Sequence, residues 1–102
     1  MYPPGMPLFY FDHYENGQHF PDDQGSVFGT VEVALYEATR AMGGIAKEAL
    51  PGVRGCELAI EVLDENRKSL FRTALRFEVQ DLSRTAALIP QETGSTHQFG
   101  SR

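Results

Sequence analysis

Apolar and polar positions follow two different periods along this chain. An apolar run at 8–11 precedes the turn signal Glu15-Asn16-Gly17, and two further runs, 58–63 and 70–79, flank a polar turn at 64–68. Within the last run, alternate residues are apolar, which is typical of a β-strand with one buried face. Polar turns between such runs indicate hairpins. The pattern therefore predicts two β-hairpins, one near each end of the patterned region.

Between the hairpins, apolar residues recur at three- and four-residue steps, which is the period of an amphipathic helix. The stripe consists of Val31, Leu35, Ala38, Met42, Ile45 and Ala49. Thr30 is a suitable N-cap, and Pro51-Gly52 ends the pattern. We expect a helix from about Thr30 to Leu50, weakened in its last turns by the pair Gly43-Gly44.

This order predicts an α+β fold of the type ββαββ, with a mainly antiparallel four-stranded sheet and one helix packed on one face. We expect a single domain over residues 7–82. Residues 1–6 are predicted to be a flexible N-terminal extension, and 83–102 a flexible C-terminal tail because the periodicity fades there. The predicted core residues are Leu35, Met42, Ile45, Ile60, Val62, Phe71, Leu75, Phe77 and Val79.

The first strand is apolar on both of its faces. Phe9 and Phe11 point one way, whereas Leu8, Tyr10 and Tyr14 point the other. A single helix covers only one face of a sheet, so one of these sets needs another cover. We therefore take all five residues as a candidate interaction surface and expect a homo-oligomer, with a two-fold symmetric dimer as its simplest form.

Charge and cysteine content narrow the classes of partner. Lys and Arg total 9 against 14 Asp and Glu, a net charge of −5, and the basic residues are scattered. On electrostatic grounds we therefore expect no nucleic-acid binding. No apolar run is long enough to span a bilayer, so no membrane association is expected. Cys56 is the single cysteine, and a reduced thiol fits a cytoplasmic location.

Few residues of this sequence could carry chemistry, and we predict no catalytic, cofactor-binding or metal-binding residues. A divalent-metal site is one interpretation of four residues that are close in sequence: His13, His19, Asp22 and Asp23. Their spacing matches no established metal-binding motif. The alternative is an Asx-type turn that ends at Gly25 with a positive φ.

Two further candidates have structural readings. Asp12 and Asp64 could form a carboxylate pair for acid–base chemistry only if their strands are neighbours. The simpler interpretation is that each is a solvated residue at the end of a strand. Cys56 is read as a small buried or half-buried thiol rather than a nucleophile.

Several motifs resemble those of a family of short proteins from rhizobia-like bacteria, catalogued only as a domain of unknown function. The matching residues are Met6-Pro7, Phe9-Tyr10-Phe11-Asp12, Gly17, Pro21-Asp22-Asp23, Gly25, Ala34, Glu37, Ala38, Leu58-Ala59-Ile60-Glu61-Val62 and Asp64-Glu65. The likeness covers Met6 to about Val79 and implies no reaction, cofactor or catalytic residue. Members usually begin at the Met-Pro pair, which implies that Met1–Gly5 is an added or mis-started extension.

Two classes of function follow. The first is a non-enzymatic protein–protein interaction module that self-associates and has room for a further, unidentified protein partner. The alternative is an antitoxin-like regulator that sequesters a partner protein, because a hairpin followed by a Thr-x-Glu-x-Ala helix at 30–34 is similar to HicB-type antitoxins. The Asp-Leu-Pro-Gly-Cys segment of those antitoxins is replaced here by Asp22-Asp23-Gln24-Gly25. A small hydrolase is the least favoured class.

Overall fold

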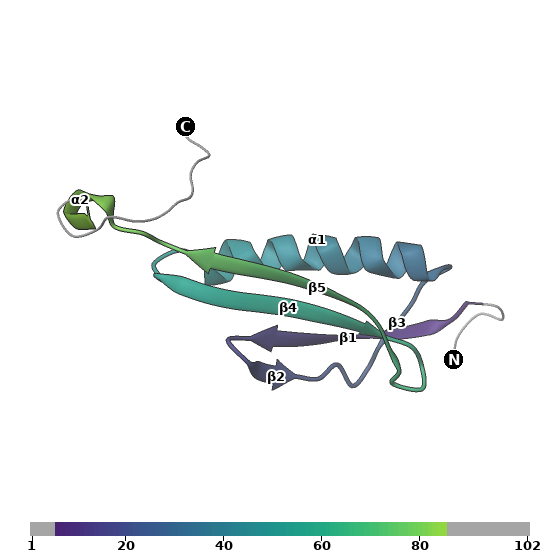
Figure 1. Cartoon of the computed structure of the whole chain (residues 1–102). Coiled ribbons are helices and arrows are strands. Elements are labelled where there is room, and N and C mark those ends of the chain that lie inside the picture. Colours follow the sequence, from purple (N-terminus) through teal and green to yellow (C-terminus); the bar gives the residue numbers. More distant parts are fainter. Residues whose placement is uncertain (1–5, 86–102) are drawn as a thin grey trace.

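The computed structural model describes residues 6–85, except for the side chains of the last two of them. Its elements are strands β1 (Leu8–Glu15), β2 (Gln18–Phe20) and β3 (Ser26–Val27), helix α1 (Val31–Ala49), strands β4 (Gly55–Leu63) and β5 (Ser69–Glu78), and the short helix α2 (Leu82–Thr85). The predicted α+β class with an antiparallel sheet is confirmed (Figure 1). The predicted extension 1–6 lies outside the described residues except for Met6, as does most of the predicted tail 83–102.

The sheet has the strand order β2-β1-β4-β5, with β3 paired to the start of β1. All of these pairings are antiparallel. The prediction of four strands in the order ββαββ is therefore only roughly matched, because the two-residue β3 precedes the helix. β3 runs in the same direction as β2, because the loop between them leaves β1 and then returns the chain to it, where Val27 lies opposite Leu8.

Helix α1 begins as the sequence predicts. The Thr30 side chain accepts a hydrogen bond from the Val33 amide at 3.1 Å, which satisfies one of the free amides of the first turn. The helix continues without interruption through Gly43 and Gly44 and ends at Ala49. It lies along one side of the sheet, beside β4 and β5 (Figure 1). Neither helix in the described part of the chain has the length and apolar character needed to cross a bilayer.

The core lies between α1 and one face of the sheet, called here the helix side. Ala34 and Ala38 are fully buried, so the small side chains let the helix pack closely on β4. The cluster is completed by Phe9, Met42, Cys56, Leu58, Ile60 and Val62. Met42, Ile60 and Val62 are thus confirmed as core residues, whereas Leu35, Ile45 and Phe77 are half-buried.

Three residues of the predicted core lie at the surface instead. Phe71 and Val79 are each 42% exposed and Leu75 is 37% exposed. Their alternation was read correctly, since Phe71 pairs with Val62 and Leu75 with Leu58, which are buried on the helix side. The prediction of their burial was wrong because β5 is the last strand in the described part of the sheet, and no strand of residues 6–85 shields its outer edge.

This division of the core predicts different costs for two truncations. Ile60→Ala should lower the free energy of unfolding by about 2–5 kcal/mol, since it leaves a cavity in the packed interior. Leu75→Ala should cost about 1 kcal/mol, because over a third of the side chain is already in water. Urea denaturation of both variants checks this, and equal losses would contradict the assignment of β5 to an exposed edge.

Candidate functional site

The face of the sheet that points away from α1, called here the open face, carries polar and aromatic side chains. Cross-strand register places Asp12, Glu61 and Arg72 side by side, and it aligns Tyr14 with Ala59 and Ala74. Directly opposed residues of neighbouring strands point to the same face. β1, β4 and β5 therefore build this surface together.

Tyr14 is held from three directions on the open face. Its hydroxyl donates a 3.2 Å hydrogen bond to Glu61, its ring stacks on His19 with centroids 4.5 Å apart, and the Arg72 guanidinium lies 4.7 Å from its ring centroid. Burial, together with the Glu61 carboxylate, raises the pKa of the Tyr14 hydroxyl above its ordinary value. The phenol is therefore neutral near pH 7 and acts as a donor.

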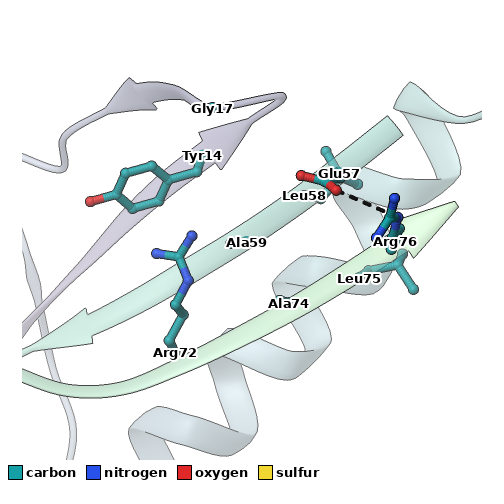
Figure 2. A pocket seen from close by; sticks show the side chains of 9 residues that line it. All are labelled: Tyr14, Gly17, Glu57, Leu58, Ala59, Arg72, Ala74, Leu75 and Arg76. Carbon is teal, nitrogen blue, oxygen red and sulfur yellow. Dashed lines mark ion pairs between the residues drawn. The ribbon is translucent and has the colours of Figure 1, made fainter. Parts of the chain in front are cut away.

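An open hollow of about 350 Å³ lies beside Tyr14 (Figure 2). Small Ala59 and Ala74 leave this space between the larger side chains around it. Arg72 lies 3.8 Å from Glu61, and Arg76 lies 3.5 Å from Glu57. Because each guanidinium has a carboxylate beside it, the hollow has no surplus positive charge with which to select an anion.

Asp12 is the only buried charged residue in the described part of the chain, with 2% of it exposed. Its carboxylate accepts hydrogen bonds from Arg67 at 2.7 Å, from His19 Nε2 at 2.8 Å and from the Asp22 amide at 3.0 Å. Burial by itself raises the pKa of Asp12, but these partners outweigh it and hold the pKa below its ordinary value. The carboxylate is therefore a fixed structural anion.

Asp22 organises the loop that follows β2. Its carboxylate accepts hydrogen bonds from the backbone amides of Phe11, Gln24 and Gly25, each at 3.0 Å. Burial opposes ionisation of Asp22, and these amides together with Arg67 lower its pKa nonetheless. The predicted Asx-type turn is thus confirmed for Asp22, and so is the positive φ of Gly25, at 75°.

Gly25 is required for a second reason besides its φ. A Cβ atom at this position would lie 2.9 Å from Leu8 Cδ1 and 3.0 Å from the Phe9 carbonyl oxygen. The Leu8 contact is closer than real Cβ atoms show, and the contact with the Phe9 carbonyl is tighter than most, so the loop packs closely on β1 because a side chain is absent here.

The four residues considered for a metal site are not brought together. His19 binds Asp12, and Asp22 binds backbone amides. His13 lies on the helix side next to Phe20, with ring centroids 5.4 Å apart. Among the described residues no group of three His, Cys, Asp or Glu side chains is placed to hold a metal ion.

The other chemical candidates also have structural roles. The Asp64 carboxylate accepts hydrogen bonds from the amides of Asn66 and Lys68, and so caps the β4–β5 turn rather than pairing with Asp12. Cys56 is a buried free thiol within the core cluster. The residue that does reach Asp12 is Arg67, which the sequence reading missed because the two are 55 positions apart.

The five residues of the predicted interaction surface divide between the two faces. Leu8 and Phe9 are buried within the chain, and Phe11 is half-buried against Phe28, with ring centroids 5.7 Å apart. Tyr10 and Tyr14 are half-buried on the open face, where Arg67 and Arg72 cover their rings. Within this set only the two tyrosines contribute to the open face that a partner could reach.

Comparison with known proteins adds one finding. Residues 8–76 match the model of a domain of unknown function, DUF6894. The chain belongs to the DUF6894 family. The match runs from the first residue of β1 almost to the end of β5, so the Asp12 cluster and the open face are parts of the DUF6894 domain. No curated protein and no solved structure matches the chain.

The buried Asp12 gives a first prediction for this DUF6894 domain. Asp12→Ala should lower the free energy of unfolding by about 3 kcal/mol, because it removes the acceptor shared by Arg67, His19 and the Asp22 amide. Asp23→Asn, an exposed substitution in the loop after β2, should change the free energy of unfolding by under about 0.5 kcal/mol. Chemical denaturation compares the two, and similar losses would show that the cluster does not stabilise the fold.

The lowered pKa values of Asp12 and Asp22 predict acid sensitivity. Their stabilising contribution is present above the unfolded pKa, near 3.9, and is lost as pH falls through the lower folded values. Thermal melting between pH 6 and pH 2, at roughly unit steps, should therefore show stability that declines below about pH 4. The Asp12→Asn variant should decline less steeply over this range; an unchanged slope would exclude Asp12 as a source of the effect.

Proposed function

We propose that this DUF6894 protein is a non-enzymatic protein–protein interaction module that self-associates, and that it does so through the outer edge of β5. The strand order supports the choice of edge. Among the described residues, β5 pairs with β4 alone, over ten residues from Ser69 to Glu78. β2, at the opposite end of the sheet, has only three residues. A long unpaired edge is a template for pairing with another strand.

The exposed apolar row on β5 is the observation that carries this proposal. Phe71 and Leu75 lie on the helix side of β5, Val79 directly follows its last residue at the next four-residue step, and each of the three is more than a third exposed. Single exposed apolar residues are ordinary, but a row along an unpaired strand combines a hydrophobic surface with free backbone groups. An added strand would cover the apolar row and satisfy the backbone groups together.

The backbone of β5 shows which amides point away from β4. The Val79 amide donates to the Arg54 carbonyl at 2.8 Å, so at position 79 the strand bonds inward, toward β4. Inward and outward bonding alternate along a strand. The amides of Arg72, Ala74, Arg76 and Glu78 therefore point away from β4. These are the groups that a second strand would bond.

The open face supports this choice indirectly. Arg67 covers the ring of Tyr10, and Arg72 covers the ring of Tyr14. Arg72, which also lines the hollow, has the Glu61 carboxylate beside it. The polar groups of this surface have partners within the chain, whereas the outer edge of β5 pairs with no other strand among residues 6–85. The net charge of −5 makes protein a better partner than nucleic acid. A cytoplasmic setting, without a cofactor or a membrane partner, is part of the same proposal.

A proline on the outer edge tests this function. Ala74→Pro removes an outward amide and leaves the β4–β5 ladder intact, a placement that edge strands tolerate. The variant should keep a melting temperature within a few degrees of wild type measured at low protein concentration, and it should lose self-association in analytical ultracentrifugation at micromolar concentration. Thr73→Pro is the matched control: it removes an inward amide and should unfold the domain.

Two results would contradict the proposal. A wild-type chain that stays monomeric at micromolar concentration would exclude self-association. An Ala74→Pro variant that associates as strongly as wild type would place the contact elsewhere, with the open-face tyrosines as the next candidates. A monomeric wild-type chain would be consistent with an antitoxin-like role, since a subunit that sequesters another protein need not bind its own copies.

A further inference from the structure

We infer that two copies of the chain pair through β5 in an antiparallel register whose two-fold axis passes through Leu75. This inference rests on the proposed function and adds which residues meet. It identifies the partner as a second copy of this chain, and it follows from three properties of β5: the direction of its amides, the spacing of its exposed apolar residues and the position of its charges.

The direction of the amides limits the possible registers. Outward amides belong to the even-numbered residues 72–78, because the Val79 amide points inward. In a symmetric antiparallel pair, outward-bonding residues must lie opposite outward-bonding residues. The axis therefore passes through a residue, since an axis between two residues would place inward-bonding positions opposite outward ones.

The apolar row determines through which residue of β5 the two-fold axis passes. Leu75 is the middle member of the row Phe71, Leu75 and Val79. An axis through Leu75 places Phe71 opposite Val79 of the partner subunit and Leu75 opposite its own copy. Every exposed apolar residue of the row then meets another. An axis through Thr73 pairs Phe71 with Leu75 but leaves Val79 beyond the paired region.

The charges favour the same register. With the axis at Leu75, Arg72 lies opposite Glu78 of the partner subunit, and symmetry makes this contact twice. An axis at Ala74 instead opposes Arg72 to Arg76, and an axis at Arg76 opposes that residue to its own copy. Opposite charges across an antiparallel pair are favourable, and like charges are unfavourable. Arg72 is half exposed beside Glu61 and so has room for a second carboxylate.

The resulting dimer has a definite architecture. Directly opposed residues share a face, so the two sheets join into one and both α1 helices lie on the same side of it. The two apolar rows then run together between the helices, where each excludes water from the other. The hollow by Tyr14 lies on the opposite side of the joined sheet, where Arg72, Ala74 and Arg76 of β5 line it.

A charge exchange tests the register in the full-length chain. Arg72→Glu and Glu78→Arg should each raise the dimer dissociation constant by about tenfold, because each places two like-charged pairs in the interface. The double variant should return to within about threefold of wild type. It carries the same loss of the Arg72–Glu61 contact as the first single variant, so its recovery reports the pair between subunits. Sedimentation equilibrium gives all four constants.

Cysteine cross-linking gives an independent readout. In the proposed register the two copies of residue 75 face each other as a pair without mutual backbone hydrogen bonds, about 4.5 Å apart at Cα, which suits a disulfide. Leu75→Cys should therefore form a covalent dimer on mild oxidation. Ala74→Cys is the matched control: its two copies are offset diagonally by about 7–8 Å and should cross-link poorly. Cys56 is buried and stays in both variants.

The outcomes separate the two proposals. A wild-type dimer that is lost in Ala74→Pro, with recovery in the charge exchange and cross-linking at 75, supports both. A wild-type dimer lost in Ala74→Pro that shows no recovery, or that cross-links better at 74 than at 75, overturns the register and leaves the β5 edge as the interaction surface. A monomeric wild type overturns both.

Discussion

The fold depends on one buried carboxylate. Asp12 lies in the middle of β1 and binds groups from β2, from the loop after β2 and from the β4–β5 turn. An ion of this kind is costly to bury and is stable only when its hydrogen-bonding capacity is filled. Its three partners come from separate segments, so the carboxylate fixes these segments relative to one another around the middle of β1.

The position of α1 explains why the two sides of the sheet differ so much. Small Ala34 and Ala38 let the helix pack tightly over β4, where it buries Leu58, Ile60 and Val62. A single helix is too narrow to cover a sheet of this width, so the outer strand remains exposed. The same packing that completes the core thus leaves exposed apolar residues along the outer strand.

Local features were predictable from the sequence because their causes are local. The helix, its Thr30 cap, the Asp22 turn and the positive φ of Gly25 each depend on residues close in the chain. The split of the first strand into two faces follows from its period of two. Strand order depends instead on pairing between distant segments, and without it the exposure of Phe71 and Leu75 could not be inferred. Arg67 as the partner of Asp12 was hidden for the same reason.

The distance along the chain between Asp12 and Arg67 has a consequence for folding. The two residues are 55 positions apart, and β1 pairs with β4 only across the intervening helix. Contacts of such long range require closure of a large loop before they contribute any stability, which slows folding. During synthesis, β1 is made well before β4, its central partner in the sheet. The first third of the domain therefore leaves the ribosome with β1 paired to β2 and β3 alone, and it can complete its fold only after the β4–β5 turn has been made.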